Sequence, residues 1–313
     1  MTPRKAFENT LSSEYPRINL VESYFAANFP YFAKTVSKRR DDFGKDWCDE
    51  FEMELTVFFG GDDARLKNAA HGYGQFALDG LRLQKKFDKT LRYENQSYAD
   101  LKAEVYLNRD YMFSLYLPGN LLSHYLWPHH YNLKRWFQQQ FVSLAKRERL
   151  TTFCDVGVGT GFYSKEMLMN LPGTEGYGYD ISDYSLEHAM TMVRLWGFGG
   201  RYHCDRRDIL ADPPDRLHDC AVNVEVLEHL EDPVAFLKGL RRMLKRGGYA
   251  FVTAAIDAPN KDHIYLYRNL ESISRELELA GFKVVAQENF PAFLASKPGE
   301  TVPQNGSFIV QAA

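Results

Sequence analysis

The stretch LTTFCDVGVGTGFYSKEMLMN, residues 150–170, places a short β-branched and aromatic run directly before a glycine-rich turn and a helical segment. Gly157, Gly159 and Gly161 let the chain turn sharply, and they let a ligand approach bare backbone at the start of the helix, where amide donors converge. This order of strand, glycine turn and helix predicts an α/β fold with a ligand site at the end of the first strand.

Short strands and helical segments alternate after this turn, which is typical of a parallel sheet wrapped by helices. The predicted strands are 150–156, 175–179, 201–204, 220–224, 249–255, 282–286 and 306–311. Helices are predicted over 233–244, where we expect Gly247 and Gly248 to end the helix, and over 271–282. The fold class predicted for residues 149–313 is therefore α/β, with a Rossmann-like sheet of seven strands.

Residues 1–148 have a different character, since they look helical and aromatic and show no clear strand alternation, repeat or low-complexity tract. Apolar residues recur at helical spacing over 133–144, so this segment should pack against the layer beneath it. We predict a helical N-terminal domain over 1–148, which is either a packed cap or a lid that shapes a substrate pocket. Its stretch 123–131 contains three histidines, and such histidines are more often surface or core groups than catalytic ones.

Composition limits the classes of partner. Of 313 residues, 45% are hydrophobic, which is enough for well-packed cores. The 38 basic and 41 acidic residues are mixed along the chain, so nothing favours nucleic acid or an anionic membrane. No apolar run approaches the roughly 18 residues that span a bilayer, and the first residues lack the apolar core of a signal peptide. We expect a cytoplasmic protein that acts on a small molecule, with a homodimer left open.

Acidic residues at the ends of three predicted strands sharpen the choice of ligand. Asp155 ends the first strand, Asp180 stands just past the second, and Asp208 follows the third. Asp180 is placed to accept hydrogen bonds from both hydroxyls of a ribose, and Asp208 is near where an adenine amino group would lie. A dinucleotide fingerprint would need its third glycine at the position of Phe162, so an NAD-binding function is disfavoured.

Together these features resemble the class I S-adenosylmethionine-dependent methyltransferases over residues 148–313. The cofactor contacts predicted on this basis are Asp155, Gly157, Gly159, Gly161, Asp180, Ile181, Asp208, Ile209 and Asn223. The last two predicted strands resemble the antiparallel end of that family's sheet. The resemblance implies S-adenosylmethionine as cofactor and methyl transfer as the activity.

A second group of polar residues lies in NVEVLEHL, residues 223–230, at the end of the fourth predicted strand. If a helix begins at Glu225, then Glu228 and His229 follow at i+3 and i+4 and project from the same side. Two carboxylates and an imidazole on one face can hold a divalent cation and leave positions open for substrate oxygens. His263, in the loop after the fifth strand, lies on the same edge of the sheet and could supply a fourth ligand.

The pattern E-x-x-E-H with a distant histidine resembles the metal-dependent O-methyltransferases of ubiquinone biosynthesis and of small-RNA 2′-O-methylation. The resemblance implies Glu225, Glu228, His229 and His263 as ligands of Mg, Mn, Fe, Co or Zn. A metal at this site would suit a substrate that chelates through two oxygens, and the additional N-terminal region favours a specialised metabolite; we expect O-methylation ahead of C- or N-methylation. Two alternatives stay open: a metal-independent N- or C-methyltransferase with His263 or His229 as catalytic base, and an inactive S-adenosylmethionine-binding subunit of a partner protein.

Overall fold

The centre of the molecule is a sheet of seven strands in the order β3-β2-β1-β4-β5-β7-β6. The computed structural model describes residues 15–93, 97, 102–295, 297 and 300–313. The strands are β1 (Thr152–Val156), β2 (Glu175–Asp180), β3 (Tyr202–Arg206), β4 (His218–Asn223), β5 (Leu244–Ile256), β6 (Phe282–Pro291) and β7 (Gln304–Ala312). Strands β1 to β5 pair in parallel, while β7 is antiparallel to both of its neighbours, β5 and β6. The predicted Rossmann-like sheet of seven strands is confirmed.

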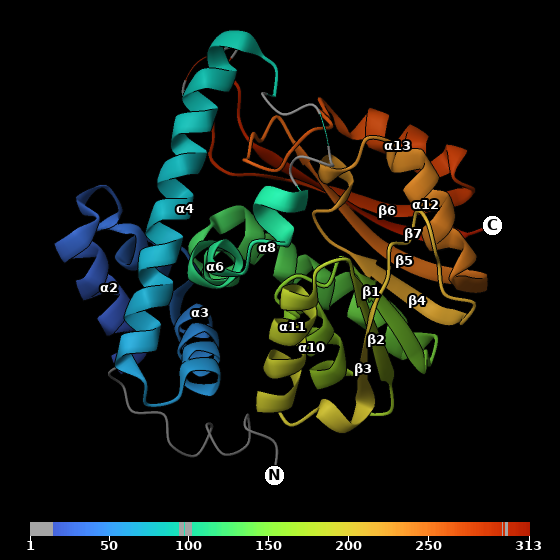
Figure 1. Ribbon diagram of the computed structural model, residues 1–313, viewed down its shortest axis with the longest axis horizontal. Coiled ribbons are helices and arrows are strands. Elements are labelled where there is room, and N and C mark those ends of the chain that lie inside the picture. The colour runs from blue at the N-terminus through green and yellow to red at the C-terminus, as the bar shows by residue number, and fades with distance from the viewer. Residues whose placement is uncertain (1–14, 94–96, 98–101, 296, 298–299) are drawn as a thin grey trace.

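Helices cover both faces of the sheet (Figure 1). Those that connect the strands are α10 (Phe162–Asn170), α11 (Asp183–Leu195), η5 (Gly199–Arg201), η6 (Leu227–His229), α12 (Pro233–Arg242) and α13 (Leu270–Leu279). Because strand side chains alternate between faces, each strand contributes to two cores. Phe153 and Phe251 belong to the core that contains α10 and α11, whereas Cys154 and Val252 belong to the core that contains α12 and α13.

The helix predicted over 233–244 ends earlier than expected, and the two glycines do not end it. Helix α12 stops at Arg242 and β5 begins at Leu244, so Gly247 and Gly248 lie inside the strand, where its register against β4 shifts. Gly247 has a φ of 75°. The prediction was wrong here because pairing with β4 starts before the glycines, and they form an irregularity in the strand instead of a helix cap.

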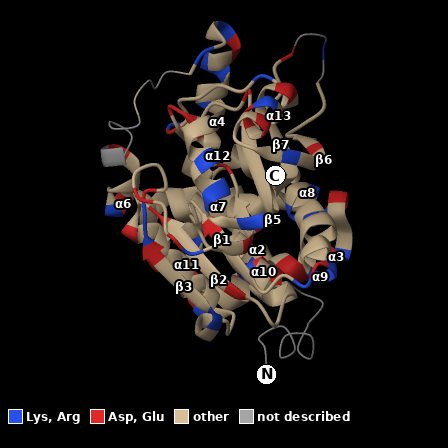
Figure 2. Ribbon diagram, turned by 90° about the vertical axis from the view of Figure 1, so that its right-hand side faces the viewer, with Lys and Arg blue, Asp and Glu red and all other residues tan. Residues whose placement is uncertain are grey.

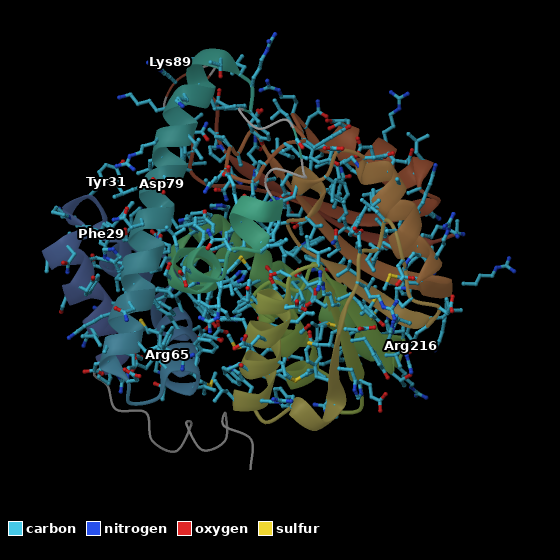
Figure 3. The ribbon with its side chains drawn as sticks, in the orientation of Figure 1. Phe29, Tyr31, Arg65, Asp79, Lys89 and Arg216 are labelled. Carbon is cyan, nitrogen blue, oxygen red and sulfur yellow. The ribbon has the colours of Figure 1, made fainter. Side chains whose placement is uncertain are left out.

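The N-terminal residues that the structure describes are helical, as predicted. They form α2 (Pro16–Asn28), η1 (Pro30–Phe32), α3 (Thr35–Phe59), α4 (Asp63–Thr90), η2 (Lys102–Tyr106), α6 (Arg109–Tyr111), η3 (Met112–Tyr116), α7 (Leu117–Leu126), α8 (Pro128–Trp136), η4 (Phe137–Val142) and α9 (Ser143–Arg147). The long helix α4 stands beside α2 and α3 (Figure 1), and Arg65 and Lys89 mark its two ends in Figure 3. Among the described helices, none combines the length and the apolar character needed to cross a membrane.

The last N-terminal helices pack directly on the sheet. Phe137 and Phe141 of η4 lie with ring centroids 4.8 and 5.6 Å from the ring of Phe251 on β5. Trp136 at the end of α8 lies 5.7 Å from the same ring. The hydrophobic core of α2, α3 and α4 continues into this layer without interruption. The N-terminal helices and the sheet therefore share one core, which holds the helices in a fixed position beside the glycine turn.

A buried ion pair strengthens this junction. Nζ of Lys165 on α10 lies 2.6 Å from a carboxylate oxygen of Glu54 on α3 and 2.6 Å from one of Glu166. The three side chains are almost completely buried. Buried charges are tolerated only when they are paired, and Lys165 is the charged partner of both carboxylates, which also accept hydrogen bonds from Tyr125 and Gln138.

Candidate active site

The glycine turn between β1 and α10 brings bare backbone to the carboxyl edge of the sheet. A Cβ atom at Gly157 would lie 2.4 Å from the side chain of Val226, and one at Gly161 would lie 2.6 Å from Cα of Ala189. Gly157 and Gly161 also have φ values of 73° and 76°. Both positions therefore require glycine for conformation and for space.

A cavity of about 110 Å³ opens beside this turn, at the ends of β1, β2, β3 and β4. Six of the predicted cofactor residues line it: Gly157, Gly159, Asp180, Ile181, Asp208 and Ile209. The structure thus brings together residues from the ends of three neighbouring strands, as expected for a crevice at the carboxyl edge of an open α/β sheet.

Two backbone amides hold the carboxylate of Asp180 at the edge of this cavity. Its Oδ1 accepts a hydrogen bond from the amide of Ser182 at 2.9 Å, and its Oδ2 accepts one from the amide of Gly159 at 3.2 Å. Burial raises the pKa of Asp180 to about 6, although the amide donors oppose this rise. A carboxylate oxygen has two lone pairs, so the group can still accept hydrogen bonds from a ligand.

Three predicted cofactor residues do not line this cavity. Asp155 accepts a hydrogen bond from Ser164 Oγ at 2.6 Å, and burial raises its pKa to about 7. Gly161 packs against α11, as its close approach to Ala189 requires. Asn223 donates from Nδ2 to the carbonyl of Val156 at 2.9 Å and is fully buried. Asn223 and Gly161 thus support the backbone that lines the crevice without lining it themselves.

A larger cavity of about 380 Å³ lies between the N-terminal helices and the sheet. Its wall is formed by α4, α7 and α8, by the glycine turn and by the connection between β6 and β7. Five residues line both cavities: Tyr116, Gly157, Gly159, Glu225 and His229. Two ligands bound side by side would meet at these residues.

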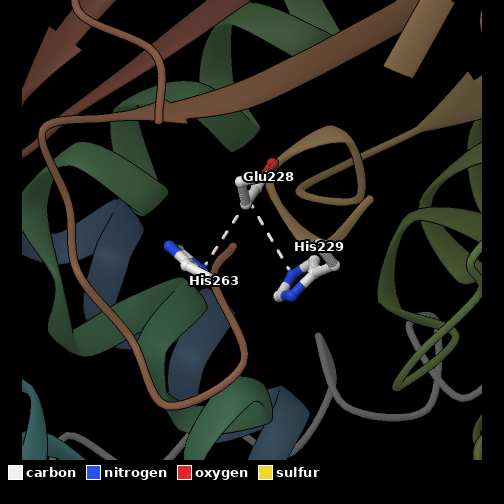
Figure 4. A group of neighbouring side chains, drawn as sticks. All are labelled: Glu228, His229 and His263. Carbon is white, nitrogen blue, oxygen red and sulfur yellow. Dashed lines mark ion pairs between the residues drawn. The ribbon is translucent and has the colours of Figure 1, made fainter. Parts of the chain in front are cut away.

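The side chains of Glu228, His229 and His263 lie close together (Figure 4), next to the residues that line both cavities. Nε2 of His229 and Nε2 of His263 each lie 4.0 Å from the same atom, Oε1 of Glu228. One ligand atom from each of the three residues lies within 4.8 Å of the others. We call these three residues the Glu-His-His cluster.

The carboxylate of Glu228 is buried beside two imidazoles, with its Oε1 4.0 Å from Nε2 of each. Both of its oxygens are buried, and neither has a hydrogen-bond partner among the residues that the structure describes. Burial, with the nearby carboxylate of Glu225, raises the pKa of Glu228 well above its ordinary value. A buried carboxylate in this state is stabilised by a proton or by a cation.

Both imidazoles of the cluster are fixed through Nδ1. Nδ1 of His263 donates to the carbonyl of Ala258 at 2.6 Å, and Nδ1 of His229 donates to the carbonyl of Asp262 at 3.0 Å. In a neutral ring with its proton on Nδ1, Nε2 keeps its lone pair. Burial lowers the pKa of His263 to about 3, so this ring is neutral. Two imidazoles oriented by carbonyl groups, beside a carboxylate, form a donor set that suits a divalent transition metal or zinc.

Asp262 and Tyr106 complete the surroundings of His229, and the sequence analysis missed both. The hydroxyl of Tyr106 donates to Oδ2 of Asp262 at 2.9 Å and lies 3.1 Å from Nδ1 of His229. Burial acts to raise the pKa of Asp262, but His229, His263 and the Tyr106 hydroxyl together hold it below its ordinary value. Asp262 could have been found as the neighbour of His263 in sequence. Tyr106 lies 123 residues before His229, and no motif marks it.

Glu225 is not one of the three cluster residues, although its carboxylate interacts with that of Glu228, and the helix expected to begin there does not form. Only the short turn η6, Leu227–His229, is helical, and Glu225 has a φ of 55°. The amide of Glu225 donates to Oγ1 of Thr253 at 2.9 Å, and the same hydroxyl donates to Oε1 of Glu225 at 2.8 Å. Thr253 on β5 thereby holds Glu225 in the left-handed conformation, which prevents a helical turn. The expectation that a helix starting at Glu225 places Glu228 and His229 on its side was therefore wrong.

The strand order, the glycine turn and the acidic residues beyond β2 and β3 are those of the class I S-adenosylmethionine-dependent methyltransferases. A family model described as "Methyltransferase domain" matches residues 129–287, just over half of the chain, so the chain belongs to the methyltransferase family. Its methyl donor is S-adenosylmethionine. The predicted class and the predicted enzymatic activity are confirmed.

Two curated relatives are similar to part of the chain. The ubiquinone biosynthesis O-methyltransferase of Parvibaculum lavamentivorans is 33% identical over 113 residues, which cover 36% of this chain and 43% of that protein. The enzyme of the same name from Nitrosomonas europaea is 31% identical over 126 residues, covering 40% of this chain and 52% of that protein. The chain thus spans about half of the length of these relatives or less.

Solved structures of methyltransferases are also similar. The N-methyltransferase NodS of Bradyrhizobium japonicum, solved in complex with S-adenosylhomocysteine, matches with a TM-score of 0.44 and 18% identity. The match covers 58% of this chain and 87% of that one.

Proposed function

We propose that this enzyme is a metal-assisted O-methyltransferase of a small molecule that chelates through two oxygens. The observation that carries the proposal is the buried carboxylate of Glu228, which has no hydrogen-bond partner in the described residues and faces Nε2 of both His229 and His263. A divalent cation bound there would compensate this charge and lower the pKa of a substrate hydroxyl. The similarity to ubiquinone biosynthesis O-methyltransferases supports oxygen as the methylated atom.

The roles of the residues follow from their contacts. Glu228, His229 and His263 would hold the cation, with their orientation supported by Asp262 and by the carbonyl of Ala258. Glu225, expected as a fourth ligand, lines both cavities beside them. In this proposal residues 149–313 form the catalytic domain, and residues 1–148 form a cap that excludes water from the acceptor.

A catalytic base is the alternative role for His263. A general base is most effective when its pKa lies near the working pH. Burial lowers the pKa of His263 to about 3, so its Nε2 is a poor proton acceptor. The same neutral nitrogen remains a good metal ligand, which supports a metal-assisted reaction over metal-independent N- or C-methylation.

The size and surface of the molecule support a small acceptor. The cavity of about 380 Å³ has room for one small organic molecule beside the cofactor crevice. Basic and acidic residues are interspersed over the described elements in the view of Figure 2. A nucleic-acid substrate would call for a basic stripe, so a small molecule is the better proposal.

Metal content of the purified enzyme tests the proposal. Wild type incubated with Mg, Mn, Fe, Co or Zn and then desalted should retain one of these metals at near-stoichiometric level, measured by plasma mass spectrometry. Glu228→Gln and His263→Ala should lose it, because each removes a ligand atom of the cluster. His203→Ala, which changes an exposed histidine on β3, should retain it.

The fourth ligand is tested by Glu225→Gln. If Glu225 supports the cation only through its charge, this variant keeps the metal with lower affinity, whereas a directly ligating Glu225 gives the same loss as Glu228→Gln. A wild type that binds S-adenosylhomocysteine but stays empty with all the metals would contradict the proposal and return His229 or His263 to the role of base.

A further inference from the structure

The wall of the larger cavity carries three histidines that lie outside the Glu-His-His cluster. His124 lies on α7, and His129 and His130 lie at the start of α8. The ring centroids of His129 and His130 are 4.5 Å apart, and those of His124 and His130 are 5.9 Å apart. All three line the cavity, and the proposed methyl-transfer chemistry uses none of them.

Aromatic neighbours fix the orientation of two of these rings. His124 stacks on Phe162, the first residue of α10, with centroids 4.0 Å apart and an interplanar angle of 14°. His129 stacks on Trp127 with centroids 5.5 Å apart and an angle of 14°. Stacked rings cannot rotate freely, so their nitrogen atoms are held in set directions before a ligand arrives.

Hydrogen bonds determine which nitrogen carries the proton. Ser123 Oγ donates to the carbonyl of Asn120 at 2.8 Å, so Nδ1 of His130, 3.0 Å from Oγ, is the donor of that contact. Nε2 of His130 is then an acceptor. Nδ1 of His124 and of His129 is buried with no hydrogen-bond partner among the residues described. An unpaired lone pair is tolerated better than an unpaired buried N–H, which places the proton of these two rings on Nε2.

The three rings are neutral. Burial lowers the pKa of His124 and His129 well below the ordinary value and that of His130 to about 3. Lys165 and Lys134 lower the pKa of His124 further. The site therefore offers hydrogen-bonding groups without a charge, in a wall that is otherwise largely aromatic and aliphatic.

We infer that His124, His129 and His130 form a recognition site for a hydroxyl group of the methyl acceptor. Two Nε2–H donors and one Nε2 acceptor match a hydroxyl, which accepts two hydrogen bonds and donates one. Phe76 and Trp127 line the same cavity, so the acceptor has an aromatic or apolar body. We name these three residues the histidine triad.

The inference rests on the proposed function, because the cavity that holds the histidine triad also reaches His229 and His263. The acceptor would present its methyl-accepting oxygens to the Glu-His-His cluster and a separate hydroxyl to the triad. An acceptor without that hydroxyl leaves buried polar groups unpaired, and sites of this kind discriminate strongly against such analogues.

Two stilbenes test the inference. Piceatannol carries a catechol ring at one end and hydroxyl groups at the other, and its analogue keeps the catechol but has an unsubstituted phenyl ring. Titration calorimetry in the presence of S-adenosylhomocysteine measures binding without requiring turnover. We expect the wild type to bind piceatannol about 10- to 100-fold more tightly than the analogue, as two or three hydrogen bonds imply.

Variants of the triad locate that preference. His124→Phe and His129→Phe keep a flat ring for stacking but remove the hydrogen bonds, so the ratio of the two affinities should fall to about 1–3. Their affinity for S-adenosylhomocysteine should stay at the wild-type value, which shows that they are folded. His203→Phe, on the exposed side of β3, should keep the wild-type ratio.

Equal binding of the two stilbenes by the wild type, or no binding of either, would overturn the inference. So would a preference for piceatannol that persists in both triad variants. Failure of the proposed function gives a different result: piceatannol is still preferred through the triad, but no metal is retained and no methyl group is transferred to oxygen.

Discussion

Substitution of Gly161 by alanine has two separate costs, one from the left-handed backbone conformation and one from a clash with α11. Gly161 has a φ of 76°, and left-handed backbone costs an L-residue about 1–2 kcal/mol. The added Cβ would lie 2.6 Å from Cα and 2.8 Å from Cβ of Ala189, so α11 has to shift. Overpacking of this kind costs about 1–3 kcal/mol. Gly161→Ala should therefore lower the free energy of unfolding by about 2–5 kcal/mol.

Two matched substitutions separate these strains. Gly159 has a φ of 50°, and its added Cβ would meet nothing closer than 3.9 Å, so Gly159→Ala should lose only the conformational part, about 1–2 kcal/mol. Gly173 has open space and no left-handed φ, so Gly173→Ala should be neutral or stabilising by up to about 1 kcal/mol. Urea denaturation without cofactor measures all three. If Gly161→Ala unfolds no more easily than Gly159→Ala, the packing of α11 on the turn is misassigned.

Affinity for S-adenosylhomocysteine should increase as the pH rises through about 6, because burial raises the pKa of Asp180 to about 6 and only the ionised carboxylate accepts freely from ribose hydroxyls. Calorimetry should show this increase in wild type and a flat, weaker profile in Asp180→Asn. Glu228→Gln should abolish the thermal stabilisation by a bound cation, about 2.7 kcal/mol at 100 Kd. In chelator this variant should melt no lower than wild type, since its amide avoids a buried charge. Lys165→Met should lower the free energy of unfolding by about 3–5 kcal/mol in urea titrations, because it leaves Glu54 and Glu166 buried with only neutral hydrogen-bond donors; adding Glu54→Gln should recover part of the loss.

Most of the sheet was predictable because strand-forming residues gather in short runs between turn residues. Each predicted strand overlaps an observed one, but strand ends depend on partners that the local sequence does not show. Strand β5 begins at Leu244, before the predicted 249–255, because Leu244 pairs with His218 across a glycine-containing irregularity. Strand β6 reaches Pro291, beyond the predicted 282–286, because β7 pairs along its whole length.

The candidate site divides in the same way. His229 and His263 follow β4 and β5, which are parallel neighbours, so their approach could be expected from the order of strands. The conformation of Glu225 could not, because a threonine on the adjacent strand imposes it. Tyr106 reaches His229 only because the N-terminal helices share a core with the sheet. Contacts that depend on such long-range packing leave no spacing pattern in the sequence.

The part of the chain that matches the family and the part that does not contribute differently to specificity for the methyl acceptor. The family match, residues 129–287, contains the whole Glu-His-His cluster and all the residues predicted to bind the cofactor. The lining from α4 and α7, including His124, and that from the β6–β7 connection lie outside it. Relatives that share only the matched part therefore support the methyl donor, whereas the choice of acceptor has to be read from side chains outside it, such as that of His124. Exchanging those side chains should change which acceptor binds without changing affinity for S-adenosylhomocysteine.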